Sequence, residues 1–153
     1  MQYPKQWEFL KNKFEAGPTA GGLAHAYLFS GQDEAGVKSF VQEFVALVCG
    51  LKKGVTQYID LLVVKSENSD SSLKNEKDMM EIDIDQIRAV QQFLSYKSYY
   101  GGYKIVIIEN AQRMNAQAQN CFLKSLEEPK GKTLIILQSA NPEFLLPTIF
   151  SRC

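Results

Sequence analysis

The chain has 153 residues, a length that fits one domain or one domain of a longer protein. Hydrophobic residues make up 45% of it and charged residues 22%, which are ordinary globular values and exclude wholesale disorder. Lysine plus arginine and aspartate plus glutamate each number 17, so the totals give no sign of a strongly basic nucleic-acid-binding protein. A local basic patch is still compatible with these totals.

Membrane and disulfide signals are missing from the sequence. Its apolar runs stay below the roughly 18 residues that a bilayer requires, and residues 1–14 lack the apolar core of a signal peptide. The three cysteines, Cys49, Cys121 and Cys153, are odd in number and widely spaced, which fits neither a disulfide framework nor a metal cluster. We therefore expect a cytoplasmic protein with reduced thiols and no membrane partner.

The first third of the chain alternates helical and extended patterns. A helix is expected over 6–16, where three large apolar side chains share one stripe before a Gly-Pro pair stops it. A short buried strand is expected over 24–29, followed by a polar turn over 30–36. The next helix is expected over 37–48, because its apolar residues recur at intervals of three and one.

The middle of the chain contains the most polar segment. A strand rich in branched residues is expected over 59–64, and residues 65–77 are too polar to bury, which predicts an exposed loop. Asp83 and Gln86 resemble a capping box and predict a helix that a Gly-Gly pair ends.

The last third of the chain is predicted to form the central strands of the sheet. Strands are expected over 104–109 and 133–138, where apolar runs without alternation indicate burial on both faces, as in a parallel sheet. A helix is expected over 115–128 and a short helix or turn over 144–150. The alternation of strands and helices predicts a three-layer α/β/α sandwich with a mainly parallel sheet. Because residues 1–153 end on an apolar stretch, we expect the N-terminal piece of a longer protein.

A near match to a phosphate-binding loop follows the first strand. Such a loop consists of Gly, four further residues and then Gly-Lys-Ser or Gly-Lys-Thr. Its backbone amides surround the phosphates, its lysine contacts the outer phosphates, and its Ser or Thr hydroxyl binds magnesium. Gly31 and Gly36 have that spacing, but Val37 stands between Gly36 and the pair Lys38-Ser39, which would follow the glycine directly in such a loop. One extra helical residue turns both side chains by roughly 100°. The loop alone fits a plain strand–helix turn equally well.

The charges around this loop also weaken it as a nucleotide site. Asp33 and Glu34 oppose a nearby anion by on the order of 1–4 kcal/mol each. An ATPase of this type has two acids at the end of its central strand, whereas this chain has Glu109 followed by Asn110, and an amide cannot act as a base. Glu109 could contact magnesium, although strand-end capping is the commoner use of such residues. The residues therefore predict a degenerate site with weak or no ATP binding and no resident metal.

Four stretches of the chain resemble the clamp-loader subunits of the AAA+ class. Residues 120–129 (NCFLKSLEEP) and 146–153 (LPTIFSRC) are similar to the LLK-x-LEEP and LP-T-I-x-SRC signatures. Residues 23–31 (LAHAYLFSG) resemble the HA-Y-L-F-x-G opening, and 82–88 (IDIDQIR) resemble a helix start of the same proteins. The resemblance covers most of the chain and implies a P-loop NTPase fold of the AAA+ type.

Bacterial DNA polymerase III has two related branches of this family. The gamma/tau branch implies an intact phosphate loop, an Asp-Glu pair and four zinc-binding cysteines, but here only Cys49 stands at such a position, so we predict no zinc. The departures resemble the delta-prime branch, whose nucleotide site is often degenerate and whose lid and collar domains would follow Cys153. This resemblance implies gamma/tau and delta subunits, the sliding clamp and, indirectly, primed DNA as partners.

The resemblance also gives a role to Ser151, Arg152 and Cys153. In the family, the arginine of this motif reaches the ATP of the neighbouring subunit, and an arginine finger raises the rate roughly 10³–10⁵-fold in well-studied phosphate-loop enzymes. Spacing alone would indicate only a surface arginine. We expect a non-hydrolysing module of the polymerase III holoenzyme that helps load the clamp during DNA replication and completes a partner's ATP site with Arg152.

Two alternatives stay open. The first is an active clamp-loader ATPase that tolerates the shifted loop and uses ATP and magnesium at Gly31, Gly36, Lys38, Ser39 and Glu109.

The second is a single-strand DNA binder that uses Tyr96, Tyr99, Tyr100 and Tyr103 with Lys97 and Lys104. Partly buried tyrosines around a Gly-Gly turn are the simpler interpretation of that cluster. His25, at the start of a strand, is expected to pack or cap rather than act as a base.

Overall fold

The computed structural model describes residues 3–17, 19, 21–51, 58–66 and 81–153. Its elements in chain order are α1 (Pro4–Ala16), β1 (Ala26–Ser30), α2 (Glu34–Cys49), β2 (Leu61–Val64), α3 (Ile84–Ser95), β3 (Lys104–Ile108), η3 (Ala111–Arg113), α4 (Ala116–Glu127), β4 (Thr133–Ser139), η4 (Pro142–Phe144) and α5 (Pro147–Phe150). The predicted helices and strands are confirmed with shifts of a few residues at their ends, and η3 and η4 were not predicted. The prediction that Gly101-Gly102 ends the third helix is wrong, because α3 already ends at Ser95 and Tyr96 follows in an extended conformation. Most of the predicted loop over 65–77 lies outside the described residues.

The strands form one parallel sheet in the order β1-β4-β3-β2. The central strands β3 and β4 are buried along their whole length, which confirms the burial on both faces that their apolar runs predicted. In a parallel sheet, all carboxyl ends of the strands lie at one edge. The chain turns from β1 into α2, from β3 into η3 and from β4 into η4 at this edge.

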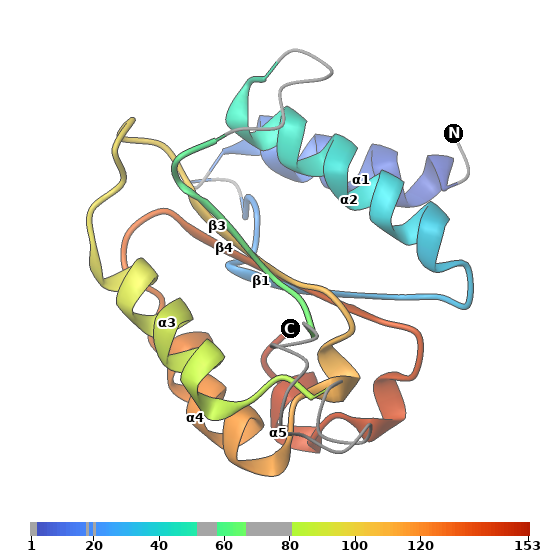
Figure 1. Ribbon diagram of the computed structural model, residues 1–153. Helices are drawn as coiled ribbons and strands as arrows, with labels where there is room; N and C mark the ends of the chain where they lie inside the picture. The colour runs from blue at the N-terminus through green and yellow to red at the C-terminus, as the bar shows by residue number, and fades with distance from the viewer. Residues whose placement is uncertain (1–2, 18, 20, 52–57, 67–80) are drawn as a thin grey trace.

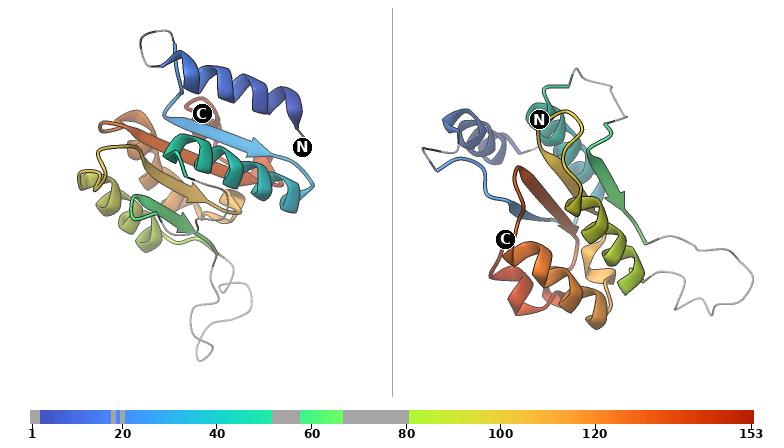
Figure 2. Two further views of the ribbon diagram at one scale, coloured as in Figure 1. Left: turned by 90° about the horizontal axis from the view of Figure 1, so that it is seen from above. Right: turned by 90° about the vertical axis from the view of Figure 1, so that its left-hand side faces the viewer.

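Helices cover both faces of the sheet (Figures 1 and 2). One core joins α1 and α2 to the sheet face that carries Ile105 and Ile107, with Phe44 fully buried in it. The other core joins α3, α4 and α5 to the opposite face, with Phe122 fully buried in it. The predicted three-layer α/β/α sandwich is therefore confirmed. In the part of the chain that the structure describes, no helix is long and apolar enough to cross a membrane.

Side-chain caps start the two longer helices, α3 and α4, of the second layer. Asp83 accepts a hydrogen bond from the Gln86 amide at 3.0 Å, and the Gln86 side chain accepts one from the Asp83 amide at 3.1 Å. This reciprocal pair is the capping box that the sequence predicted at the start of α3. Asn115 caps α4 by accepting from the Ala118 amide at 2.8 Å.

Candidate functional site

A hollow of about 330 Å³ opens at the carboxyl edge of β1, β3 and β4. It is lined by Gly31, Glu34, Ala35, Val37, Lys38, Glu109, Asn110, Gln138, Ser139 and Ala140. Three of the predicted nucleotide-site residues, Gly31, Lys38 and Glu109, therefore meet there although they come from separate parts of the chain. Ser39 instead lines a different hollow with Trp7 and residues of α2.

An ion pair spans the hollow. The Lys38 Nζ lies 3.2 Å from Glu109 Oε1 and donates to Oε2 at 3.4 Å. Lys38 thus reaches the hollow in spite of the extra residue Val37, so the expected displacement holds for the Ser39 hydroxyl but is wrong for the long lysine side chain. The positive charge of the Lys38 ammonium, which could bind a phosphate, is instead paired with the Glu109 carboxylate.

The start of α2 differs from the predicted loop. The helix begins at Glu34, so only residues 31–33 connect it to β1, and Gly36 lies in the first helical turn. Asp33 caps the helix, since its Oδ1 accepts from the Gly36 amide at 3.1 Å and its carbonyl from the Val37 amide at 3.0 Å. A carboxylate therefore occupies the helix N-terminus, where a phosphate-binding loop would place its anion.

Packing and backbone conformation account for two residues that line the hollow, Gly31 and Asn110. A Cβ atom on Gly31 would lie 3.1 Å from Val37 Cγ2, so glycine allows the turn to approach α2 closely. Asn110 has φ 54° and ψ 50°, a left-handed conformation that asparagine tolerates better than most residues. It turns the chain from β3 into η3 directly after Glu109.

The second predicted site lies after α5. Arg152 Nη2 forms an ion pair with Glu127 Oε1 of α4 at 2.6 Å, and Nη1 approaches the Ser151 hydroxyl at 3.2 Å. The side chains of Arg152 and Glu127 are 35% and 46% exposed, so the guanidinium is accessible from solvent. Arg152 is not among the residues that line the hollow at the carboxyl edge. The structure therefore keeps the two predicted sites apart.

Gln119 is a buried, hydrogen-bonded residue near the second predicted site that the sequence patterns missed. It is buried on α4, where its Nε2 donates to the Met114 carbonyl at 3.1 Å and the Phe144 carbonyl at 3.4 Å. Its Oε1 accepts from the Leu146 amide at 2.7 Å. These bonds fix the segment that leads into α5 and so position Arg152. Its one sequence signal is a polar residue directly beside the buried stripe of the helix.

The sequence also predicted a packing or capping role for His25. The His25 ring nitrogen Nε2 lies 2.7 Å from the Leu126 carbonyl oxygen near the end of α4, which confirms the expected capping or packing role.

Burial raises the pKa of the Cys49 thiol to about 11, so this thiol is protonated at neutral pH. The described residues contain no cluster of three or more histidines, cysteines or acids that could hold a metal, and the lack of zinc stays a prediction.

Comparisons with known proteins place the chain in a family. A sequence model described as "DNA polymerase III, delta subunit" matches residues 4–153. The DNA polymerase III subunit delta' of Pseudomonas aeruginosa is 37% identical over 136 residues, which cover 85% of this chain and 42% of that protein. The delta' subunit of Bacillus subtilis is 31% identical over 154 residues, covering 98% of this chain and 45% of that protein.

Solved structures share the fold of this chain. The crystal structure of a DNA polymerase III gamma subunit-related protein from Thermotoga maritima superposes with a TM-score of 0.68 at 30% identity, covering 97% of this chain and 44% of the other. The RuvB T158V protein of Thermotoga maritima has a TM-score of 0.60 at 15% identity, covers 95% of this chain and 41% of the other, and shows the shared fold alone.

The fold and the hollow at the carboxyl edge define an α/β protein of the P-loop, AAA+ class. Within that class, the chain belongs to the DNA polymerase III delta-subunit family of clamp-loader proteins. It spans less than half the length of the two delta' relatives, whose covered shares are 42% and 45%.

Proposed function

We propose that this chain is the AAA+ module of a delta-prime-type clamp-loader subunit that does not hydrolyse ATP itself. In the full-length protein it acts with gamma/tau and delta subunits to load a sliding clamp onto primed DNA, and Arg152 completes the ATP site of a neighbouring subunit. The observation that carries the first half of this proposal is the capped start of α2, where Asp33 already bonds the Gly36 amide.

Three features oppose ATP binding at the carboxyl edge. The connection over 31–33 is too short to surround a phosphate with several free amides, and Asp33 places a negative charge at the helix start. The Lys38 ammonium is paired with Glu109 at 3.2 Å. A triphosphate would have to displace Glu109 from Lys38 and overcome the charge of Asp33, which makes this a poor nucleotide site.

Arg152 is suited to act on a neighbour. Its guanidinium presents a fork of donors that matches phosphate oxygens, and its ion-pair partner is one partly exposed carboxylate, Glu127. Exposed ion pairs of this kind contribute only about 0–1 kcal/mol. Exchange of Glu127 for a phosphate of the adjoining subunit therefore costs little, so the ion pair orients the arginine without trapping it.

The test uses the full-length protein assembled with its partner subunits. We expect Arg152→Ala and Arg152→Lys to lower DNA-stimulated ATP hydrolysis, because lysine lacks the planar fork. Arg88→Ala is the matched control, since Arg88 is an exposed arginine paired only with Asp85 three residues away. Turnover that stays at the wild-type level in Arg152→Ala, with assembly intact, would reject the finger role.

A second candidate function is an active ATPase, and one observation favours it: Lys38 and Glu109 line the same hollow as Gly31. Equilibrium dialysis of the full-length protein with labelled ATP separates the two candidates. The proposal predicts no micromolar binding to the wild type. Micromolar binding that Lys38→Ala removes and Lys5→Ala keeps would instead establish the ATPase.

A further inference from the structure

A basic groove lies at the edge of the sheet opposite to the nucleotide-type hollow. Two adjoining hollows of about 170 and 520 Å³ share Leu94, Ser95 and Lys130 and form one groove between the end of α3 and the connection from α4 to β4. The 96–103 and 128–132 connections lie at the same end of the molecule in Figures 1 and 2. We call this feature the lysine groove; its cations are Lys97, Lys104, Lys124, Lys130 and Lys132.

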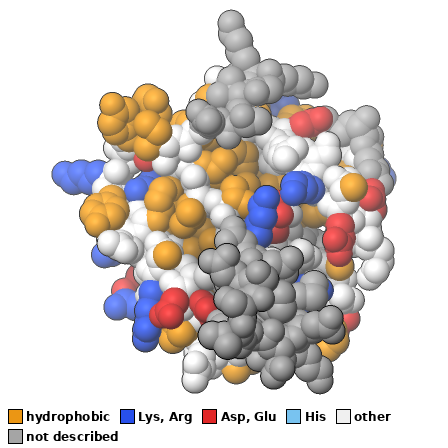
Figure 3. Space-filling view, in the orientation of Figure 1, with side chains coloured by type: hydrophobic (Ala, Val, Ile, Leu, Met, Phe, Trp, Pro, Cys, Tyr) orange, Lys and Arg blue, Asp and Glu red, His pale blue; other side chains and the backbone are white. Residues whose placement is uncertain are grey.

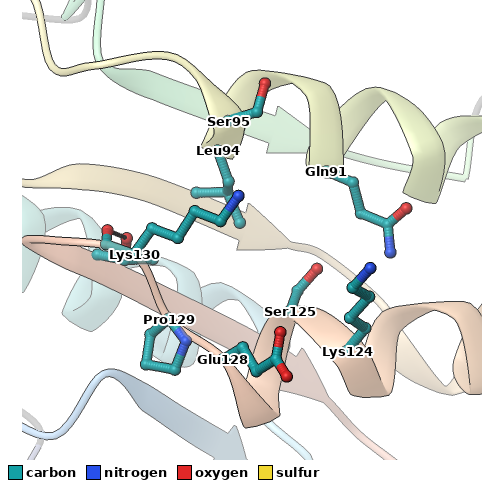
Figure 4. A pocket seen from close by; sticks show the side chains of 9 residues that line it. Gln91, Leu94, Ser95, Lys124, Ser125, Glu128, Pro129 and Lys130 are labelled. Atoms are coloured by element: carbon teal, nitrogen blue, oxygen red, sulfur yellow. Dashed lines mark hydrogen bonds between the residues drawn. The ribbon is translucent and has the colours of Figure 1, made fainter.

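The lysine groove concentrates positive charge in a chain whose formal net charge is zero. Among its described lining residues the only carboxylate is Glu128. Lys104 is buried, with its Nζ 4.1 Å from the centre of the Phe93 ring. The other four lysines are exposed, and no described carboxylate forms an ion pair with them. Lys124 and Lys130 extend toward Gln91 and Leu94 of α3 (Figure 4).

Exposed aromatic rings adjoin these lysines. Tyr96, Tyr99 and Tyr100 are 61%, 72% and 63% exposed, so the interpretation of this cluster as partly buried is wrong for these three residues. Tyr96 lines the groove, and the edge of the Tyr99 ring meets Tyr100 at 4.9 Å between ring centres. Hydrophobic and basic side chains gather on the side of the molecule that carries the 96–103 connection (Figure 3). Tyr58 stacks on one face of the Tyr100 ring at 5.8 Å between ring centres, and the remaining exposed surface of the three rings is available to a ligand.

A buried carboxylate fixes the backbone that carries the tyrosines. Asp60 is only 2% exposed, and it accepts from the Ser98 hydroxyl at 2.7 Å and from the amides of Tyr99 and Tyr100 at 2.9 and 3.2 Å. Burying a carboxylate is costly unless it is bonded in this way. The three bonds hold the loop in one conformation while its rings point outward, which lowers the entropy that a ligand must remove on binding.

We propose that the lysine groove and its tyrosines bind a single-stranded nucleic acid. The lysines would contact phosphates and the tyrosine rings would stack on bases, the combination that sequence-tolerant single-strand sites use. An acidic peptide would match the lysines alone, and a duplex would keep its bases out of reach of the rings. The site is separate from the nucleotide-type hollow and from Arg152, so it does not depend on the proposed clamp-loading function.

The charge half of this proposal is tested in the full-length protein with a fluorescein-labelled oligo(dT) of 20 nucleotides. Anisotropy is measured across a series of salt concentrations for the wild type and for Lys130→Gln/Lys132→Gln. We expect weaker binding and a decrease in the slope of log K against log salt of about 1.4, because each lost single-strand phosphate contact removes about 0.7. Lys5→Gln/Lys11→Gln, two exposed lysines on α1, should bind as the wild type does.

The stacking half is tested with Tyr99→Leu/Tyr100→Leu. We expect a loss of affinity on the order of tenfold or more with an unchanged salt slope, because stacking is lost and charge is kept. Phe9→Leu, another exposed aromatic, is the matched control. Wild-type protein that does not bind the oligonucleotide, or groove variants that bind it like the wild type, would overturn the proposal. Groove variants that lose only a protein partner would overturn it in favour of protein docking.

Discussion

Asp60 shows how one residue couples stability to pH. Burial raises the pKa of its carboxyl group, but hydrogen bonds from Tyr99, Ser98 and Tyr100, with the charge of Lys104, outweigh burial and lower that pKa below its usual value. A carboxyl group whose pKa is lower in the folded protein stabilises it above the unfolded-state pKa, which is about 4. That stabilisation is lost as the pH falls through the folded-state pKa.

Asp60→Asn should therefore destabilise the protein in a pH-dependent way. At pH 7 we expect the free energy of unfolding to fall by about 1–3 kcal/mol. The amide replaces a charged acceptor, and its NH₂ group would face the donors that Asp60 accepts from. The difference from the wild type should shrink as the pH falls below about 4, where the wild-type carboxylate also becomes protonated. Urea denaturation at pH 7 and at acid pH measures this.

The exposed carboxylate of Asp85, 80% accessible, provides the control as Asp85→Asn. We expect little change at either pH, since exposed ion pairs contribute little. A deficit in Asp60→Asn of the same size at both pH values would contradict the ionic role of Asp60.

At the scale of elements, α5 depends on one side chain of α4. Gln119 satisfies the carbonyls of Met114 and Phe144 and the amide of Leu146, and a hydrophobic residue in its place would leave these groups without partners. The short α5 has only one turn, so its position depends on the burial of Ile149 in the core and on these hydrogen bonds. Arg152 is therefore positioned through Gln119.

Gln119→Leu should loosen the segment that precedes Arg152. We expect a loss of stability of at least about 1–3 kcal/mol, because buried polar groups lose their partners. Hydrogen exchange should accelerate over residues 144–152 more than in the central strands, since this segment loses its anchor. Asn120→Ala is the control, because Asn120 is exposed and its side chain bonds only the Ala116 carbonyl of its own helix. Equal protection of 144–152 in Gln119→Leu and the wild type would contradict this role.

The start of α2 shows how an element's boundary decides a site. The sequence patterns placed a turn over 30–36, yet the helix begins at Glu34 because Asp33 caps it and Glu34 lies favourably in the first turn. The three-residue shift moves Gly36 from a loop into a helix. A glycine that could have bound phosphate becomes a helical residue with its amide already bonded.

At the scale of the whole molecule, the sheet depends on helices on both of its faces. Phe44 and Phe122 are fully buried on opposite faces, each in its own hydrophobic core. Successive residues of β3 alternate between the two cores, with Ile105 and Ile107 in one and Val106 and Ile108 in the other. Loss of either core should therefore weaken the same sheet.

Phe44→Ala and Phe122→Ala should each cost about 3–5 kcal/mol, the usual effect of truncating a buried phenylalanine. Phe9→Ala should change stability little, because Phe9 is 57% exposed on α1. Urea denaturation followed by near-ultraviolet circular dichroism of the full-length protein measures the change. A neutral Phe44→Ala variant would show that the α1–α2 layer is not part of the cooperative unit.

Most helices and strands, the mainly parallel sheet and the family could be predicted from the order of residues alone. Helical and strand periodicities depend on which local face is buried, and the strands over 104–108 and 133–139 are buried on both faces, as their patterns indicate. The runs over 23–31, 120–129 and 146–153 carry the resemblance to clamp loaders in their residue order alone.

Which side chains contact each other could not be predicted before the fold was known. Lys38 pairs with Glu109, Gln119 bonds the segment before α5, and Asp60 fixes the tyrosine loop, and each of these contacts joins residues far apart in the chain. Periodicity says that a residue is buried or exposed, but its partner depends on which strands lie side by side. For that reason the ion pair in the nucleotide-type hollow, the anchor of Arg152 and the exposure of the tyrosines became visible only in the fold.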